Sequence, residues 1–283
     1  MSISTVSRNE GRIWGVGRIR LQYRSWEASH ARAALLIVHG LADHSGRYEE
    51  VGCRFAAYGF STFALDLRGH GLSEGRRGHV DRFDCLLQDV DRFRREVMGL
   101  VDVSTPLFLL GHSMGGLVAL RYEEEYETTF RGVIVVSPWL ATAVDVPRWK
   151  VTLANAVARL LPAVPFRAHI DADALSRDPD VVRAYRDDPL VHDTITPRLF
   201  VESSAAMGLA LQRSERISTP LLFVLAGEDR IVDTQRSLAF ARSVTARDVN
   251  IRVYPESRHE VLNEPDRTEA LSEIANWIED RLP

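Results

Sequence analysis

Residues 107–126 read LFLLGHSMGGLVALRYEEEY, and this stretch decides the fold. It opens with four apolar residues, which are typical of a buried strand, and the pattern from Leu117 onward is typical of a helix. Between the two, Gly111 and Gly115 stand two residues before and two residues after Ser113. A serine in such a strand–turn–helix corner needs neighbours without bulk, because the turn is tight and strained. We therefore expect the corner to raise the Ser113 hydroxyl clear of a sheet, where it can act as a nucleophile.

Strands and helices alternate along the rest of the chain. Short apolar runs, as in strands buried on both faces of a parallel sheet, occur at Ala33–Val38, Thr62–Leu65, Val133–Val136, Leu221–Leu225 and Ile251–Tyr254. Between them, apolar residues recur every three or four positions, as on the buried face of a helix. This alternation predicts a mostly parallel, doubly wound α/β sheet. The segment Arg12–Trp26, with Gly15 and Gly17, predicts an additional hairpin at the sheet edge.

Residues 138–218 break the alternation. This segment holds seven of the twelve prolines of the chain but a single glycine, Gly208. An apolar stripe with helical spacing crosses its first part, at Val146, Trp149, Leu153, Val157 and Leu160. We predict that residues 1–137 and 219–283 form one core and that residues 138–218 form a helical cap inserted into it.

The composition excludes several classes of function. The 35 basic and 39 acidic residues give a net charge of −4, which argues against a nucleic-acid partner. Lys150 is the only lysine, so Schiff-base chemistry would have a single candidate, and Cys53 and Cys85 are too few for a disulfide framework or a thiolate metal cluster. We expect no metal site. The first 30 residues lack the apolar stretch of a secretory signal, so we expect a cytoplasmic protein.

A serine nucleophile requires a general base, and the base requires an acid that orients it. In this corner architecture the acid and the histidine follow the serine in that order along the chain. His259 lies between the last strand and the last helix, at the sheet edge where parallel strands place catalytic loops. Asp229 follows the preceding strand; Glu228 and Asp233 are its rivals, and Asp233 fits the N-cap of the next helix. We predict a triad of Ser113, Asp229 and His259.

The other histidines compete less well for the role of base. His112 precedes the nucleophile and should point away from its hydroxyl, and His30 and His44 lie outside the expected position of the base. His169 and His192 fall in the predicted cap, where we expect them to face solvent.

An oxyanion hole needs two backbone donors near the nucleophile. Met114 follows the serine at the start of the predicted helix, and Leu41 follows a His39-Gly40 turn at the end of the first core strand. We predict that the N–H groups of Leu41 and Met114 form the hole. For His39 itself we expect a hydrogen-bonded role in the loop and no proton transfer.

Six segments carry a resemblance to a known family: HGLADHSGRY (39–48), DLRGHGLSEGRRGHV (66–80), GHSMGG (111–116), DDPLV (187–191), AGEDRIVD (226–233) and RHEVLNEP (258–265). In this order and spacing they resemble monoacylglycerol lipases and the related lysophospholipase-like members of the α/β-hydrolase superfamily. The resemblance runs from about residue 12 to the C-terminus. It implies the α/β-hydrolase fold, the same triad and the same oxyanion hole. It also implies hydrolysis of monoacylglycerols, or of similar single-chain lipid esters, to fatty acid and glycerol through an acyl-enzyme without a cofactor.

The cap stripe has two interpretations. Its residues Trp149, Leu153 and Val157 are candidates for binding the acyl chain of the substrate. Alternatively, the stripe belongs to an interfacial helix that docks transiently on a membrane surface, because four basic residues accompany it, Arg148, Lys150, Arg159 and Arg167. The two interpretations are compatible if the stripe is partly exposed.

Other functions of the same architecture stay open. They are a short-chain carboxylesterase, a thioesterase and an aminopeptidase, and the last would use clustered carboxylates of the cap, for which Asp171, Asp173, Asp178 and Asp180 are candidates. A non-catalytic small-molecule receptor is a further alternative, against which an intact triad argues. The sequence makes no prediction of the oligomeric state.

Overall fold

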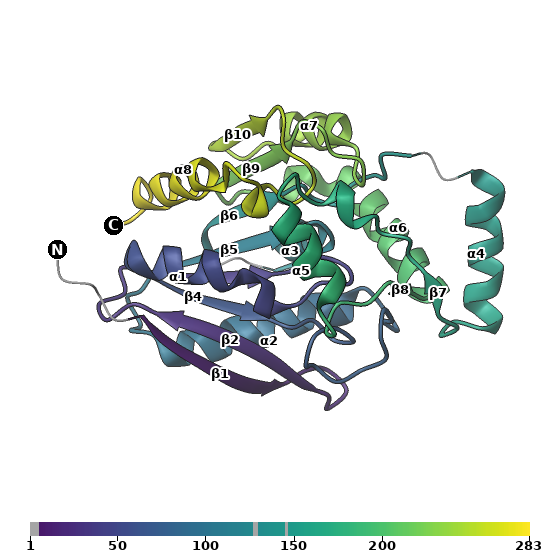
Figure 1. The fold of residues 1–283 in the computed structure, drawn as a ribbon, viewed down its shortest axis with the longest axis horizontal. Coiled ribbons are helices and arrows are strands. Elements are labelled where there is room, and N and C mark those ends of the chain that lie inside the picture. Colours follow the sequence, from purple (N-terminus) through teal and green to yellow (C-terminus); the bar gives the residue numbers. More distant parts are fainter. Residues whose placement is uncertain (1–5, 127–129, 145–146) are drawn as a thin grey trace.

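The computed structural model describes residues 6–126, 130–144 and 147–283 (Figure 1). Its centre is a sheet of eight strands in the order β1-β2-β4-β3-β5-β6-β9-β10. The strands are β1 (Ser7–Trp14), β2 (Arg20–Glu27), β3 (Ala33–Val38), β4 (Phe60–Leu65), β5 (Leu107–His112), β6 (Phe130–Val136), β9 (Leu221–Ala226) and β10 (Val249–Tyr254). In this sheet order, the six strands β4, β3, β5, β6, β9 and β10 pair in parallel with one another. Strands β1 and β2 form an antiparallel hairpin at the edge, and β2 pairs antiparallel with β4. The mostly parallel, doubly wound sheet is thereby confirmed.

Both faces of the central strands β3, β4, β5 and β9 are buried, and successive side chains of a strand point to opposite faces. On β3, Leu36 and Val38 belong to one apolar cluster, and Leu35 and Ile37 belong to another. Helices α2 (Asp84–Leu100), α3 (Met114–Glu125) and α7 (Thr234–Ser243) complete the first cluster, and α1 (Glu49–Ala57) and α8 (Arg267–Glu279) complete the second. The unbroken apolar run of β3 therefore serves two cores.

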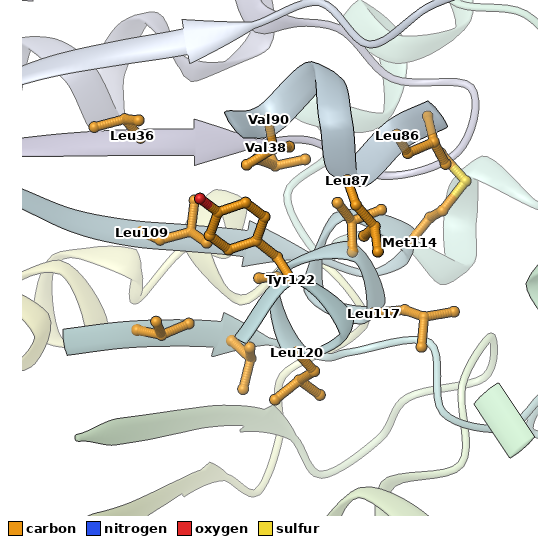
Figure 2. Packing of buried hydrophobic residues seen from close by; sticks show 14 of the residues in the cluster. Leu36, Val38, Leu86, Leu87, Val90, Leu109, Met114, Leu117, Leu120 and Tyr122 are labelled. Carbon is orange, nitrogen blue, oxygen red and sulfur yellow. The ribbon is translucent and has the colours of Figure 1, made fainter. Parts of the chain in front are cut away.

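The first cluster fixes the position of α3, the helix that follows Ser113. Figure 2 shows Leu36 and Leu109 of the sheet together with Leu86 of α2 and with Met114 and Leu117 of α3. Met114 and Leu117 have no exposed surface. Burying such side chains contributes roughly 1.5–3 kcal/mol each to folding, so the start of α3 is firmly seated on the sheet.

The chain between β6 and β9 is mainly helical, as predicted for the cap. Its elements are α4 (Arg148–Leu160), β7 (Phe166–Arg167), η2 (Ala172–Ala174), α5 (Pro179–Asp187), β8 (Thr194–Ile195), α6 (Pro197–Arg213) and η3 (Ser214–Arg216). Helix α6 packs against α3 on one side and against α4 on the other, so α4 stands at the margin of the molecule (Figure 1). Leu199, Ala206 and Ala210 of α6 are buried in the first core cluster. The boundaries at residues 138 and 218 stay a prediction.

The register of the parallel strands brings their carboxyl ends to one edge of the sheet. Val38 at the end of β3 lies opposite Gly111 of β5, and Ala226 at the end of β9 lies opposite Tyr254 of β10. The loops that follow these four strands therefore emerge side by side. They carry the residues that the sequence assigns to the site.

Candidate active site

Ser113 occupies a strained corner between β5 and α3. Its backbone has φ 53° and ψ −115°, a left-handed conformation that side chains rarely adopt. A Cβ on Gly115 would lie 2.0 Å from the Val38 carbonyl oxygen, and a Cβ on Gly111 would lie 2.3 Å from the Gly115 carbonyl oxygen. No side chain fits at either glycine without moving backbone. These close approaches are the steric reason for the glycine spacing seen in the sequence.

Asp229 and His259 meet at the edge of the sheet. The distance between His259 Nδ1 and Asp229 Oδ2 is 2.8 Å, and the Asp229 side chain is fully buried. Asp229 Oδ1 accepts hydrogen bonds from the N–H groups of Ile231 and Val232 at 2.8 and 2.9 Å. Burial alone would raise the pKa of Asp229, but His259 and these hydrogen bonds outweigh it, so the pKa lies below its usual value. The ionised carboxylate can only accept, so Nδ1 donates and Nε2 is left for proton transfer.

The two rival acids lie elsewhere. Asp233 accepts hydrogen bonds from the N–H groups of Gln235 and Arg236, at 2.8 and 3.1 Å, and caps α7. The prediction that Asp233 is an N-cap is confirmed. Glu228 is exposed, and Asp229 is the carboxylate that His259 contacts.

The turn after β3 approaches the serine closely. A Cβ on Gly40 would lie 3.1 Å from the Ser113 Cβ, and Leu41 and Ser113 line the same pocket. Met114 is the first residue of α3, where backbone N–H groups have no partner within the helix. Leu41 therefore lies beside Ser113 in the pocket and Met114 follows it in the chain, and the role of their N–H groups as the oxyanion hole stays a prediction.

His39 ties two loops together. Its Nε2 accepts a hydrogen bond from the Leu67 N–H at 3.0 Å, and its Nδ1 lies 2.7 Å from the Gly40 carbonyl oxygen, to which it donates. Burial lowers the pKa of His39, which keeps the ring neutral. The ring therefore anchors the loop that carries Leu41, in agreement with a structural role.

Ser113 and His259 open into a cavity of about 500 Å³. One part of its wall is polar and includes Asp43 and Glu260. Another part is apolar, formed by Trp139, Val144, Ile170, Leu175, Ile195, Phe200 and Ile231. A cavity with a polar part and an apolar part suits an amphipathic ligand.

A buried ionic cluster forms the polar part of the wall, and the sequence interpretation missed it. Arg47 donates two hydrogen bonds to Glu260, at 2.6 and 2.7 Å, and a third to Asp43 at 3.2 Å. Tyr48 donates to Asp43 at 3.2 Å, and the Arg47 guanidinium lies 4.8 Å from the ring centre of Tyr185. Burial would raise the pKa values of both carboxyls, but Arg47 outweighs it and holds both below their usual range. Asp43 lies in the motif 39–48 and Glu260 in the motif 258–265, and membership in these two motifs is the sequence signal that points to the cluster.

Two histidines have surroundings that the sequence did not predict. His112 lies against His259, with ring centres 4.9 Å apart, and burial lowers its pKa to about 4. His192 was expected at the surface of the cap, which is wrong: its Nε2 is buried and its ring centre lies 4.8 Å from that of His70. The segment before β8, which carries His192, packs on the loop after β4, which carries His70. This contact covers the His192 ring. His169 is exposed at the mouth of the cavity.

The cap stripe does not reach Ser113. Trp149 is 64% exposed, Leu153 55% and Leu160 81%, and Val146 lies outside the described residues. Leu153 and Val157 line a second, apolar pocket of about 320 Å³, while Trp149 lines neither cavity. The reason is the position of α6, which separates α4 from α3 and from the serine.

Comparison with known proteins places the chain in a family. A family described as "Serine aminopeptidase, S33" matches residues 29–266. The monoacylglycerol lipase of Mycolicibacterium smegmatis is 34% identical over 284 residues, which cover 98% of this chain and 99% of that protein. The monoglyceride lipase of Rattus norvegicus is 31% identical over 92% of this chain and 86% of its own length.

Solved structures agree with the sequence relatives. The crystal structure of the Paleococcus ferrophilus monoacylglycerol lipase superposes with a TM-score of 0.83 at 29% identity, over 98% of this chain and 99% of that one. The α/β-hydrolase fold and the resemblance carried by the six motifs are thereby confirmed. The chain therefore belongs to the serine aminopeptidase S33 family and, within the α/β-hydrolase superfamily, to the group of the monoacylglycerol lipases.

Proposed function

We propose that the chain is a serine hydrolase that cleaves the ester bond of monoacylglycerols, or of similar single-chain lipid esters, to fatty acid and glycerol. The observation that carries the proposal is that His259, paired with the buried Asp229, lines together with Ser113 a cavity that has a polar and an apolar part. The relatives named above support the same substrate class.

In the first half of the reaction, His259 Nε2 accepts the proton of the Ser113 hydroxyl while the serine oxygen attacks the ester carbonyl carbon. The N–H groups of Leu41 and Met114 donate to the oxyanion of the tetrahedral intermediate. The intermediate collapses, the proton passes from His259 to the leaving alkoxide, and glycerol departs. The acyl group stays bound to the serine oxygen.

In the second half, water takes the place of glycerol. His259 Nε2 accepts a proton from the water as its oxygen attacks the acyl carbon, and the same two N–H groups hold the oxyanion. Return of the proton to the Ser113 oxygen releases the fatty acid. Asp229 keeps its charge throughout, and it stabilises the imidazolium that forms in each half.

The distribution of charge favours an ester over a peptide with a free N-terminus. Binding an ammonium group needs carboxylates that no cation already neutralises, and in the cavity Asp43 and Glu260 both contact Arg47. Of the four candidate cap carboxylates only Asp171 lines the cavity. The other three form ion pairs: Asp173 with Arg186, Asp178 with Arg267 and Asp180 with Arg183. Short-chain esters and thioesters remain the alternatives that an assay must separate.

We further propose that the enzyme is cytoplasmic and touches membranes transiently through α4. The exposed side chains of Trp149, Leu153 and Leu160 supply an apolar face, and Arg159 is exposed on the same helix. Such a face binds at a lipid interface without spanning it. Among the described helices, none has the length and apolarity that crossing a membrane requires.

The experiment that tests the proposal is a turnover profile with purified protein. It covers monoacylglycerols, lysophospholipids, triacylglycerols, p-nitrophenyl esters and aminoacyl amides, with Ser113→Ala as the inactive control. We expect monoacylglycerols of medium or long chain to exceed acetyl esters in kcat/KM, and triacylglycerols to be poor substrates. An optimum at acetyl or butyryl would leave a short-chain esterase, and preference for aminoacyl amides would leave an aminopeptidase. Absence of turnover on every substrate would favour a receptor.

A further inference from the structure

We propose that Phe200 and Ile195 form the wall that ends the acyl compartment over Ser113, and that they thereby set the longest acyl chain the enzyme uses efficiently. This inference rests on the proposed function and adds to it the residues that determine chain-length selectivity. Neither residue was a candidate from the sequence, because both lie outside the apolar stripe of the cap.

The first observation is that two cavities meet at these two residues. The cavity over Ser113 measures about 500 Å³, and the pocket between α4 and α6 measures about 320 Å³. Ile195 and Phe200 line both, and among the described residues no other one does. Side chains that face a cavity on each side form a partition between them.

The second observation is that the backbone of this partition is held in place. The Thr196 N–H and its hydroxyl both donate to the Gly78 carbonyl oxygen, at 2.9 and 3.1 Å. Thr196 Oγ1 also accepts from the Leu199 N–H at 3.3 Å, which caps α6 one residue before Pro197. Phe200 lies in the first turn of α6, with its N–H bonded to the Thr196 carbonyl oxygen at 3.0 Å.

The neighbouring strand fixes the other half of the wall. Ile195 pairs with Phe166 across the β7–β8 ribbon, and Phe166 lines the second pocket only. An acyl chain that reaches this wall therefore meets two side chains on an anchored backbone. The wall cannot be moved aside by shifting a free loop.

The third observation concerns the space behind the wall. The pocket between α4 and α6 is apolar apart from Thr196, and its remaining lining is Leu153, Ala154, Val157, Phe166, Ile195, Pro197 and Phe200. Removing the Phe200 ring would join this space to the acyl compartment. Each further methylene that the chain then buries should raise kcat/KM about fourfold.

The test is kcat/KM against acyl-chain length, measured with monoacylglycerols below their micelle-forming concentrations. For the wild type we expect a rise of about fourfold per methylene followed by a break where the chain meets the wall. In Phe200→Ala the break should move to chains longer by two or more methylenes. Phe200→Leu, which keeps an apolar side chain in the packing of α6, should move the break less.

Two further variants test whether the acyl chain enters the second pocket only when the Phe200 ring is removed. Phe166→Ala removes an aromatic ring that lines the second pocket only, so the break should stay at the wild-type length. Ala154→Trp fills the second pocket; alone it should leave the profile unchanged, and combined with Phe200→Ala it should return the break to the wild-type position.

The outcomes separate this inference from the proposed function. A folded Phe200→Ala protein with an unmoved break would overturn the role of the wall and leave the proposed function intact. If Ala154→Trp alone moved the break to shorter acyl chains, the role of the wall would also be overturned. The acyl chain would then already reach the second pocket in the wild type. A wild type that hydrolyses no ester would overturn the proposed function and this role together.

Discussion

At the scale of single residues, Asp229 and Asp233 show how neighbouring carboxylates take different roles. One is buried against His259, and the other is the N-cap of α7. Their separation follows from the loop after β9, which turns Asp229 inward before the helix begins. Substituting each by asparagine removes the same charge from two positions four residues apart.

We predict that Asp229→Asn lowers kcat by roughly 10⁴, because the imidazole loses the partner that sets its tautomer. Asp233→Asn should leave kcat within a few-fold and stability nearly unchanged, since asparagine caps helices as well as aspartate does. Steady-state kinetics with a p-nitrophenyl ester, and thermal melting as a check on folding, measure both. Loss of activity in Asp233→Asn alone would reverse the assignment of the acid.

Arg47 is the residue on which the ionic cluster depends. We predict that Arg47→Met lowers the free energy of unfolding by roughly 3–5 kcal/mol, because Asp43 and Glu260 would stay buried without a cation. Arg183→Met is the matched control: its pair with Asp180 is 68% and 80% exposed, so the loss should be below about 1 kcal/mol. Urea unfolding measures both variants, and an equal loss of unfolding free energy in the two would contradict the burial of the Arg47 cluster.

At the scale of elements, the corner between β5 and α3 depends on the close approach of backbones. We predict that Gly115→Ala prevents stable folding or costs several kcal/mol, since its Cβ would lie 2.0 Å from the Val38 carbonyl oxygen. Gly208→Ala, inside α6 with no described atom beyond its chain neighbours and the local helix backbone within 4 Å of the new Cβ, should instead stabilise by roughly 0.5–1 kcal/mol. Melting temperatures of the two variants test the contrast, and a tolerated Gly115→Ala would refute the steric argument.

Helix α4 has an apolar face that is exposed in the described part of the chain. We predict that Leu160→Ser weakens binding to anionic lipid vesicles, because Leu160, 81% exposed at the end of α4, would no longer enter the interface. Leu100→Ser is the control, since Leu100 is 53% exposed at the end of α2. Vesicle sedimentation measures both. Equal binding by the two variants would remove α4 from the interface, without affecting the proposed catalysis.

At the scale of the whole molecule, buried histidines make stability depend on pH. Burial lowers the pKa values of His39, His70, His112 and His192, the last two to about 4. A histidine in the unfolded chain has a pKa of about 6.5, so below that pH the unfolded chain binds protons that the folded chain does not. Burial raises the pKa of Glu124 to about 7, which acts in the opposite direction, but the histidines outnumber it.

We therefore predict that the free energy of unfolding falls as pH decreases from about 6.5 to 4.5. His112 alone contributes up to roughly 3 kcal/mol by pH 4, from a pKa near 6.5 in the unfolded chain to about 4 in the folded one. Urea unfolding at pH 7, 6 and 5 measures the slope, and His112→Asn should reduce it. A slope of zero in the wild type would contradict burial of neutral histidines.

The sequence by itself determined the sheet and the corner, and it selected Asp229 and His259, which the structure places in contact. The sheet and the corner depend on local rules, the period of apolar residues and the space that Gly111 and Gly115 leave around Ser113. The choice of acid and base depends on their order along the chain after the serine. Even the N-cap role of Asp233 follows from its position before a helix. All of these rules use the type, spacing and order of residues along the chain, so a single sequence contains the needed information.

The tertiary structure alone decided what surrounds Ser113, Asp229 and His259. Arg47 and Glu260 are 213 positions apart, and His70 meets His192 across the interface between cap and core. Phe200, rather than Trp149, faces the cavity, because α6 packs on α3 and carries α4 on its outer side. Contacts of this kind join segments with no common local pattern, since the amphipathic stripe of a helix shows which residues are apolar but not which neighbour covers them.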